Sequence, residues 1–251
     1  LTGTPIANHT LSADYLRNAT TQQGVATLGY AAAIDSKVLF DRQTPNDLFV
    51  ANYSGVVGSN AFVTAQYSGK SFGFRNEGGS STAIQDSPFR TLGVLGVPGS
   101  LHYNAPLLSV FDPQGRNNRQ LAASVSTFLA MGGGSHDLKG GFEHFTTTLR
   151  GGGSQSATGY VFQSDYVTDA NGRPALDALG NIIPRFVPGL SRIQSFTSTP
   201  GAELDIRTLS VYARDKWTIS RHLTADLGLR YEQVRSDAPG GETEAGMRPD
   251  D

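Results

Sequence analysis

Apolar residues recur at every second position over most of the chain, and this period of two constrains the fold more than any other feature. The clearest case is the segment HLTADLGLRYE, residues 222–232, whose apolar positions are Leu223, Ala225, Leu227, Leu229 and Tyr231. Successive side chains of a β-strand point to opposite faces, so one face of this segment is apolar and the other polar. Apolar residues at helical spacing are scarce. The sequence therefore predicts an all-β protein.

Three pairs of alternating segments are separated by turn sequences, which predicts three antiparallel hairpins. They join residues 209–217 to 222–232 through Ser220-Arg221, residues 48–57 to 61–74 through residues 58–60, and residues 119–131 to 137–150 through residues 132–136. A lone strand at residues 9–18 brings the prediction to about seven strands. In the third hairpin, Leu121, Val125, Phe128 and Leu129 also fit helical spacing, and His144 falls on the apolar side. We therefore expect a bulge or a misassigned segment there.

The links between the hairpins are far longer than the turns inside them. Residues 75–118 and 151–204 form connections of about 44 and about 54 residues, and soluble domains rarely carry loops of that length. Short turns at one end and long loops at the other are typical of a transmembrane β-barrel, whose strands cross with about nine to eleven residues. We expect antiparallel barrel strands of that length, with short periplasmic turns and long extracellular loops.

The composition agrees with a wall between lipid and water, because such a wall needs only every second residue to be apolar. Charged residues make up 17% of the chain and hydrophobic residues 38%. The expected lipid-facing belt consists of Val63, Val125, Leu209, Val211, Leu223, Leu227 and Leu229. Aromatic residues near strand ends, as candidates for interfacial girdles, are Phe62, Phe145, Trp217 and Tyr231. Core aromatics of a soluble β-sandwich remain the alternative.

Several classes of protein are excluded by simple counts. The net charge is −2 without a basic stripe, so we expect no nucleic-acid partner. There is no cysteine, which removes disulfides and thiolate metal sites. The longest uncharged stretch, residues 91–111, contains Pro98 and Pro106 and several glycines, which excludes a spanning helix. The first residues lack the pattern of a signal peptide, so either the protein is not exported or its beginning is missing.

The segment LSVYARDKWTISRHLTADLGLRYE, residues 209–232, resembles the late barrel hairpin of TonB-dependent outer-membrane receptors. The matching positions are Asp215, Lys216, Trp217, Leu223, Thr224, Gly228, Leu229, Arg230, Tyr231 and Glu232. HDLKGGFEHF, residues 136–145, is similar to a strand opening of that family. GSQSATGYVFQSDYVTDANG, residues 153–172, resembles the long loop of its Oar-like, carboxypeptidase-regulatory-domain-bearing branch. With SGVVGSNAFVTAQYSGKSF, residues 54–72, the likeness covers roughly residues 45–240.

The resemblance implies an energy-coupled importer in the cell outer membrane, whose barrel has 22 strands and a plugged lumen. Residues 1–251 are then a partial barrel domain, about a third of the whole, without the signal peptide, the plug domain, the segment that contacts TonB and the C-terminal strand. The implied partners are the inner-membrane TonB energy complex, outer-membrane lipid and an unidentified small-molecule, peptide or carbohydrate ligand. The alternatives are a soluble secreted β-sandwich binding module and a passive outer-membrane channel or adhesion barrel.

No catalytic constellation is recognisable, so we expect neither an enzyme nor a cofactor. The serines in GGGSH and GGGSQ lack the nucleophile-elbow pattern and indicate turns, and no nucleotide-binding motif is present. The acidic loop with Asp165, Asp169, Asn171 and Asp177 fails the EF-hand register. It predicts an Asx-type turn at Asn171-Gly172, with a calcium role left open. No metal site is expected from the five histidines, His9, His102, His136, His144 and His222.

Two further groups of residues are candidates for ligand contact. A cross-strand charge ladder is expected on the polar face from Arg214, Lys216, Asp226, Arg230 and Glu232. Its functional alternative is contact with the plug or the substrate. The long loops carry the aromatic residues Tyr103, Tyr160, Phe162, Tyr166 and Phe186. They serve either ligand recognition or the packing of the loops against one another, and the ligand-binding residues remain unknown at this stage.

Overall fold

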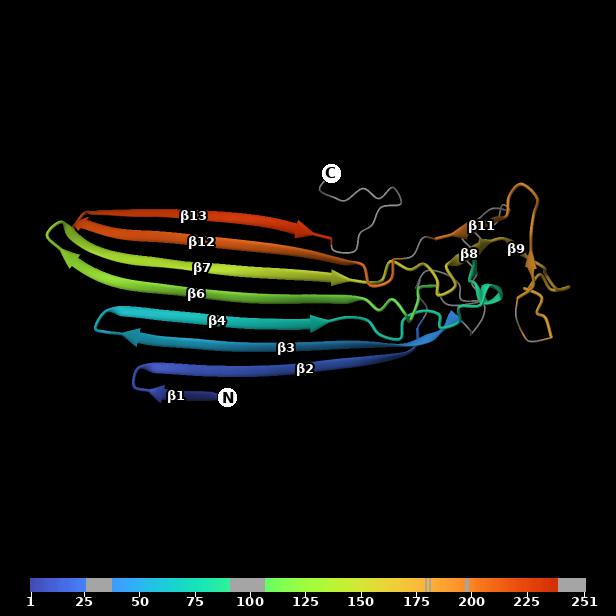
Figure 1. Ribbon diagram of the computed structural model, residues 1–251, viewed down its shortest axis with the longest axis horizontal. Coiled ribbons are helices and arrows are strands. Elements are labelled where there is room, and N and C mark those ends of the chain that lie inside the picture. The colour runs from blue at the N-terminus through green and yellow to red at the C-terminus, as the bar shows by residue number, and fades with distance from the viewer. Residues whose placement is uncertain (26–37, 91–106, 179, 181, 197–198, 239–251) are drawn as a thin grey trace.

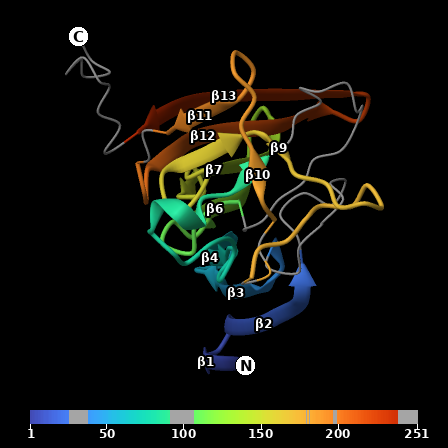
Figure 2. The same cartoon turned by 90° about the vertical axis from the view of Figure 1, so that its right-hand side faces the viewer.

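An eight-stranded antiparallel sheet dominates the computed structural model, which describes residues 1–25, 38–90, 107–178, 180, 182–196 and 199–238. Its strands are β1 (Thr2–Ile6), β2 (His9–Val25), β3 (Phe40–Val57), β4 (Ala61–Phe72), β6 (Gly115–Met131), β7 (Gly134–Arg150), β12 (Glu203–Ser220) and β13 (Leu223–Asp237). Each strand pairs with its neighbours in chain order. The long strands lie side by side (Figure 1), and seen from their loop end they follow one another around an open arc (Figure 2).

The predicted all-β class and the three hairpins are confirmed, and the strand count is corrected. The sheet has eight strands, since β1 pairs with β2. The five residues of β1, TGTPI, do not alternate between apolar and polar residues and contain a proline, so the sequence pattern does not predict a strand there.

The hairpin of β6 and β7 is more regular than predicted. Its turn consists of Gly132-Gly133 and not of five residues, and the ladder runs from Met131↔Gly134 to Gly115↔Arg150 with no register shift. The expectation of a bulge or misassigned segment is therefore wrong. His144 lies on the apolar side of β7 through the regular alternation of the strand, opposite Leu121 of β6 and Leu209 of β12.

The strands are longer than a membrane crossing requires. Apart from β1 they contain 12 to 18 residues, whereas nine to eleven were expected. At about 3.4 Å per residue, a strand of 17 residues measures about 58 Å, which is about 41 Å of height at a tilt of about 45° and exceeds the roughly 30 Å hydrocarbon thickness of a bilayer. The strands therefore continue beyond the bilayer, toward the end that carries the long links.

The long links carry short elements of their own. These are η2 (Ile84–Asp86), β5 (Phe89–Arg90), β8 (Tyr160–Gln163), β9 (Asp165–Tyr166), β10 (Pro184–Arg185) and β11 (Arg192–Ser195). Strands β11, β8 and β5 form one small sheet and β10 and β9 another, at the right-hand end in Figure 1. We call the described residues of the three links, 38–39, 73–114 and 151–202, the loop cap.

The buried core lies in the loop cap and not in the large sheet. Val38, Leu107 and Val161 form a buried cluster against which Phe196 packs. Most of the buried polar residues are in the cap as well, with Ser210 the exception in the large sheet. The described residues form no second sheet stacked on the eight-stranded one, as a sandwich would require. Among the same residues, no helix is long and apolar enough to cross a membrane.

Candidate functional site

The strand register gathers the predicted belt on one face of the sheet, which we call the apolar face. Val63 lies opposite Val125, and Val211 lies between Phe142 and Tyr231. Leu209, Leu227 and Leu229 share this parity, and these side chains are exposed, Leu229 at 84%. From Leu209 to Trp217 the belt on β12 runs about 27 Å along the strand, which is about 20 Å of height at the usual barrel tilt. This approaches the roughly 25 Å apolar band of outer-membrane barrels.

The predicted aromatic girdle is correct for only two of its four residues. Trp217 and Tyr231 lie at the two ends of the belt, whereas Phe62 and Phe145, which pair with Ser126 and Gln120, point to the other face. The aromatic residues at the loop end of the belt that the prediction missed are Tyr15, Phe49 and Tyr67.

Trp217 fixes the turn end of the belt. Its indole N–H donates to the carbonyl oxygen of Gly133 at 2.9 Å, and its ring stacks on His136 with 5.3 Å between centroids. His136 Nδ1 lies 2.8 Å from the Asp215 carboxylate. The Asp and Trp of the recognised motif thus hold two neighbouring hairpins together, which is a structural role.

The opposite face, which we call the polar face, carries several separate groups of hydrogen-bonded polar side chains. Arg214 Nε donates to Asp226 at 2.7 Å across β12 and β13, which confirms this part of the predicted ladder. Arg230 and Ser210 both donate to Glu232. Lys216 lies opposite Asp226 in the register but forms no ion pair within the described part of the chain. Further along the face, Gln120 donates to Glu143 at 2.6 Å and Thr64 bonds Ser124 at 2.8 Å.

Asp112 joins the two long links of the loop cap. Its carboxylate accepts hydrogen bonds from the Gly201 N–H at 2.8 Å and from the Ser154 N–H and hydroxyl at 2.9 and 2.8 Å. Burial alone would raise the pKa of Asp112, but the hydrogen bonds from Gly201 and Ser154 outweigh it and hold the pKa below its usual value. The residue is 3% exposed. Sequence reasoning missed it, since an Asp before a Pro resembles any turn.

The acidic loop forms turns and ion pairs. Asp169 Oδ1 accepts the N–H groups of Asn171 and Arg173, at 2.8 and 2.9 Å, which confirms an Asx turn around Asn171-Gly172. Asp165 pairs with Arg185 between β9 and β10. Within the described ranges, no group of three or more histidines and acidic residues is arranged to hold a metal ion.

The histidines and loop aromatics considered in the sequence analysis do not gather at one site among the described residues. His102 and Tyr103 lie outside the described residues. His9 bonds the Tyr53 hydroxyl, and His222 lies in the turn before β13. Phe162 and Phe186 meet edge to face with 6.4 Å between ring centroids, as expected of residues that pack the loops together. Tyr160 lies on β8 and Tyr166 on β9.

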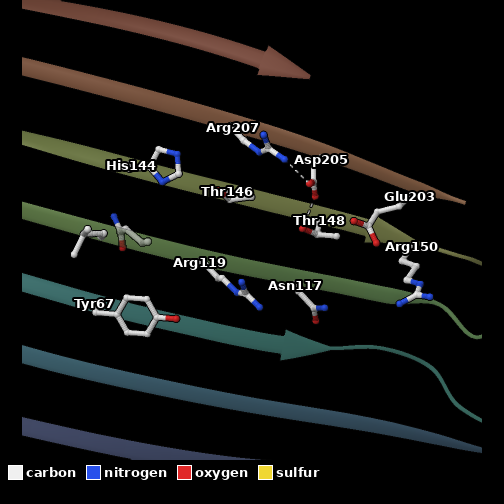
Figure 3. Close-up of a pocket in the computed structure, with 12 residues that line it drawn as sticks. Tyr67, Asn117, Arg119, His144, Thr146, Thr148, Arg150, Glu203, Asp205 and Arg207 are labelled. Carbon is white, nitrogen blue, oxygen red and sulfur yellow. Dashed lines mark hydrogen bonds and ion pairs between the residues drawn. The ribbon is translucent and has the colours of Figure 1, made fainter. Parts of the chain in front are cut away.

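A charged groove of about 640 Å³ lies on the apolar side of the sheet, between the belt and the loop cap. Figure 3 shows its side chains arising from β4, β6, β7 and β12. The charged ones are Arg119, Arg150, Glu203, Asp205 and Arg207. Arg207 and Thr148 both donate to Asp205, at 3.0 and 2.6 Å. The sequence alone did not suggest this groove, because its arginines come from three strands and lie between residues 119 and 207 of the chain.

Comparisons with known proteins identify the barrel. A model of the outer membrane beta barrel domain matches residues 4–242. Two solved structures share the fold. The outer membrane transporter YddB from Escherichia coli has a TM-score of 0.50 and 13% sequence identity, and the match covers 94% of this chain. The complex of FpvA from P. aeruginosa with pyoverdine and iron has a TM-score of 0.53 and 12% sequence identity, and the match also covers 94% of this chain.

The chain spans 27% and 29% of these two proteins, less than a third of either. None of the curated proteins compared with it matches. In a barrel wall of the outer membrane, an apolar face lies against lipid and a polar face lines the lumen. The chain belongs to the outer membrane beta-barrel domain family, and its eight-stranded sheet is a part of the wall of such a barrel.

Proposed function

We propose that the chain forms part of the wall and the outer loops of a TonB-dependent receptor of the Oar-like, carboxypeptidase-regulatory-domain-bearing branch, and that this receptor takes up a ligand. Residues 1–251 are then one piece of the barrel domain of a longer protein that also contains a plug. The role is transport and not catalysis. The observation that carries the proposal is a two-faced barrel wall whose long links at one end fold into a cap with its own buried core.

The motif residues support this assignment. Asp215 and Trp217 of the family-like triplet contact His136 of the neighbouring hairpin, and His136 opens the second family-like segment. The two segments that resemble the receptor family are therefore also adjacent in space. The two similar structures, the outer membrane transporter YddB and the complex of FpvA with pyoverdine and iron, agree with uptake as the function.

The mechanism we propose begins at the loop cap. A ligand binds to the cap from outside, where the loops are joined by Asp112 and by the small sheets. The polar face, with its charged groups from Glu143 to Glu232, lines the path through the lumen. A plug closes that path until the energy complex of the inner membrane, acting through TonB, rearranges it.

The experiment uses the full-length receptor in two assays. Purified periplasmic domain of TonB is tested for binding to the receptor, and the receptor is tested for conductance in planar lipid bilayers. A receptor of this class binds the TonB domain and shows no steady open-pore current. A steady current without TonB binding would identify a passive channel, and absence of both current and TonB binding would point to an adhesion barrel; either result overturns the proposal.

A further inference from the structure

Toward the loop cap, the apolar face gives way to charged side chains within two residues along β6 and β12. On β6 Leu121 is followed by Arg119, and on β12 Leu209 is followed by Arg207. Arg119 and Arg207 both lie opposite Thr146 of β7, and Arg207 lies opposite Arg235 of β13. Three guanidinium groups thus form one row across neighbouring strands, directly beyond the belt.

This row is unfavourable unless anions lie near it, because like charges opposite each other weaken strand pairing. Of these three guanidiniums, only that of Arg207 forms an ion pair within the described residues. A fourth arginine, Arg150, lies nearer the loop cap on β7, opposite Glu203 of β12. Asp205 and Asp237 pair with Arg207, at 3.0 and 3.4 Å. Arg119 and Arg150 form no ion pair with any described residue, although both line the groove shown in Figure 3. Glu203 and Asp205 line the same groove, but neither carboxylate forms an ion pair with Arg119 or Arg150, so these two guanidiniums can bind an external anion.

The lining of the groove indicates what kind of anion fits. The side chains of Asn117 and Thr146 offer further hydrogen-bond donors beside the two arginines. A guanidinium binds the oxygens of a phosphate through two parallel hydrogen bonds, so the set suits a phosphate group. The groove also includes Tyr67 and Leu121, which belong to the apolar belt. A ligand here meets charged donors at one end and hydrocarbon at the other.

We propose that this groove binds the phosphorylated headgroup of an outer-leaflet lipid, with Arg119 and Arg150 contacting the phosphate. The long links of an outer-membrane barrel are extracellular, so the groove lies at the headgroup level of the outer leaflet. The acyl chains then cover the exposed belt below it, beginning at Leu121 and Val211, which are 44% and 47% exposed. This inference depends on the outer-membrane location and is independent of the transported ligand.

The test measures binding of dodecyl phosphate, a single-chain alkyl phosphate, to the full-length receptor in dodecyl maltoside micelles, by native mass spectrometry. The variant Arg119→Gln/Arg150→Gln removes both charges. The matched control is Arg116→Gln, because Arg116 lies near the same end of β6 but has the opposite parity, on the polar face. We expect the double variant to bind roughly tenfold more weakly or worse, because it loses charge-assisted contacts, and the control to bind like wild type.

Two further measurements keep the result interpretable. The resistance of the folded barrel to denaturation in cold sodium dodecyl sulfate shows that each variant is folded. Arg119→Lys/Arg150→Lys keeps the charges but not the planar fork, and we expect intermediate binding.

Three results would overturn the proposal. In the first, the folded Gln double variant binds dodecyl phosphate like wild type. In the second, Arg116→Gln loses as much affinity as the double variant. In the third, inorganic phosphate competes at equal concentration, which would assign the groove to soluble anions. Binding of the TonB domain by the same receptor is unaffected in every case, so failure here is distinguishable from failure of the proposed transport function.

Discussion

The barrel wall and the loop cap place the same types of side chain in opposite environments. In the wall, Leu229 is 84% exposed and Leu227 59%, whereas in the cap Val161 is 2% exposed and Ile182 also 2%. The wall buries its apolar residues in lipid, so it needs no core of its own, and its backbone groups are satisfied by strand pairing. The cap lies in water and depends on a small core and on buried hydrogen bonds. The two regions should therefore respond to different perturbations.

The largest expected effect is that of a charge placed in the wall. Leu229→Arg on β13 puts a guanidinium in the middle of the apolar belt, opposite Ala213 of β12, and near the bilayer midplane we expect a loss of about 2–4 kcal/mol. The measurement is the free energy of unfolding of the full-length protein in lipid vesicles. Thr224→Arg, on the polar face of the same strand, serves as the control and should cost much less. Equal losses for the two variants would show that Leu229 does not face lipid.

The next effect is confined to the cap. Asp112→Asn weakens the hydrogen bonds from Gly201 and Ser154. Bonds to a charged group contribute about 1.5–3 kcal/mol, so the amides of these two residues should exchange with solvent roughly 10- to 100-fold faster. Amides of β12 and β13 should keep their wild-type rates. Asp86→Asn, at an exposed carboxylate that accepts from Ser81 in the same cap, is the matched control. Faster exchange throughout the sheet would contradict a separate cap.

Acid should loosen the cap before the wall. The pKa of Asp112 is below its usual value of 3.8, so its ionised form stabilises the cap fully above that value. This contribution is lost as the pH falls through the lowered pKa of the folded state. We expect the exchange of the Ser154 amide, corrected for its intrinsic rate, to accelerate below about pH 4 in wild type. In Asp112→Asn this acceleration should be missing; if it persists, another group controls the cap.

The smallest expected effect concerns the polar face of the wall. Arg214→Gln removes the ion pair with Asp226, but both side chains are more than half exposed. Exposed pairs contribute little to stability because water screens them. The midpoint of heat denaturation of the full-length protein should therefore stay within experimental error of wild type. A clear decrease would mean that the full barrel or its plug buries this pair, which would favour the alternative of plug contact.

The wall was largely predictable because its signal is local. Alternation and turn sequences predicted the three hairpins, the belt from Val63 to Leu229 and the pairing of Arg214 with Asp226. Where local signals were weak, the prediction failed. The segment of β1 has no alternation, and the turn before β7 has two glycines where the pattern predicts five residues. The sequence also did not show that the strands extend well beyond the membrane.

The groove and the cap depend on pairs that are distant along the chain. Arg119 and Arg207 share a row only because β7 lies between β6 and β12 in one uninterrupted register. Asp112 and Gly201 are 89 residues apart, and no pattern in either link connects them. The sequence left ligand contact and loop packing open for the loop aromatics, and in the structure Phe162 and Phe186 pack against each other.

The sequence by itself determined which segments form strands and that each strand has an apolar and a polar face, because the direction of a side chain along a strand depends only on its position in the alternation. Its motif residues also indicated an outer-membrane barrel. The tertiary structure decided the register, and with it the groove of Arg119 and Arg150 and the cap around Asp112. Strand pairing and loop packing bring together residues from distant parts of the chain, and such contacts leave no periodic signal in any one segment.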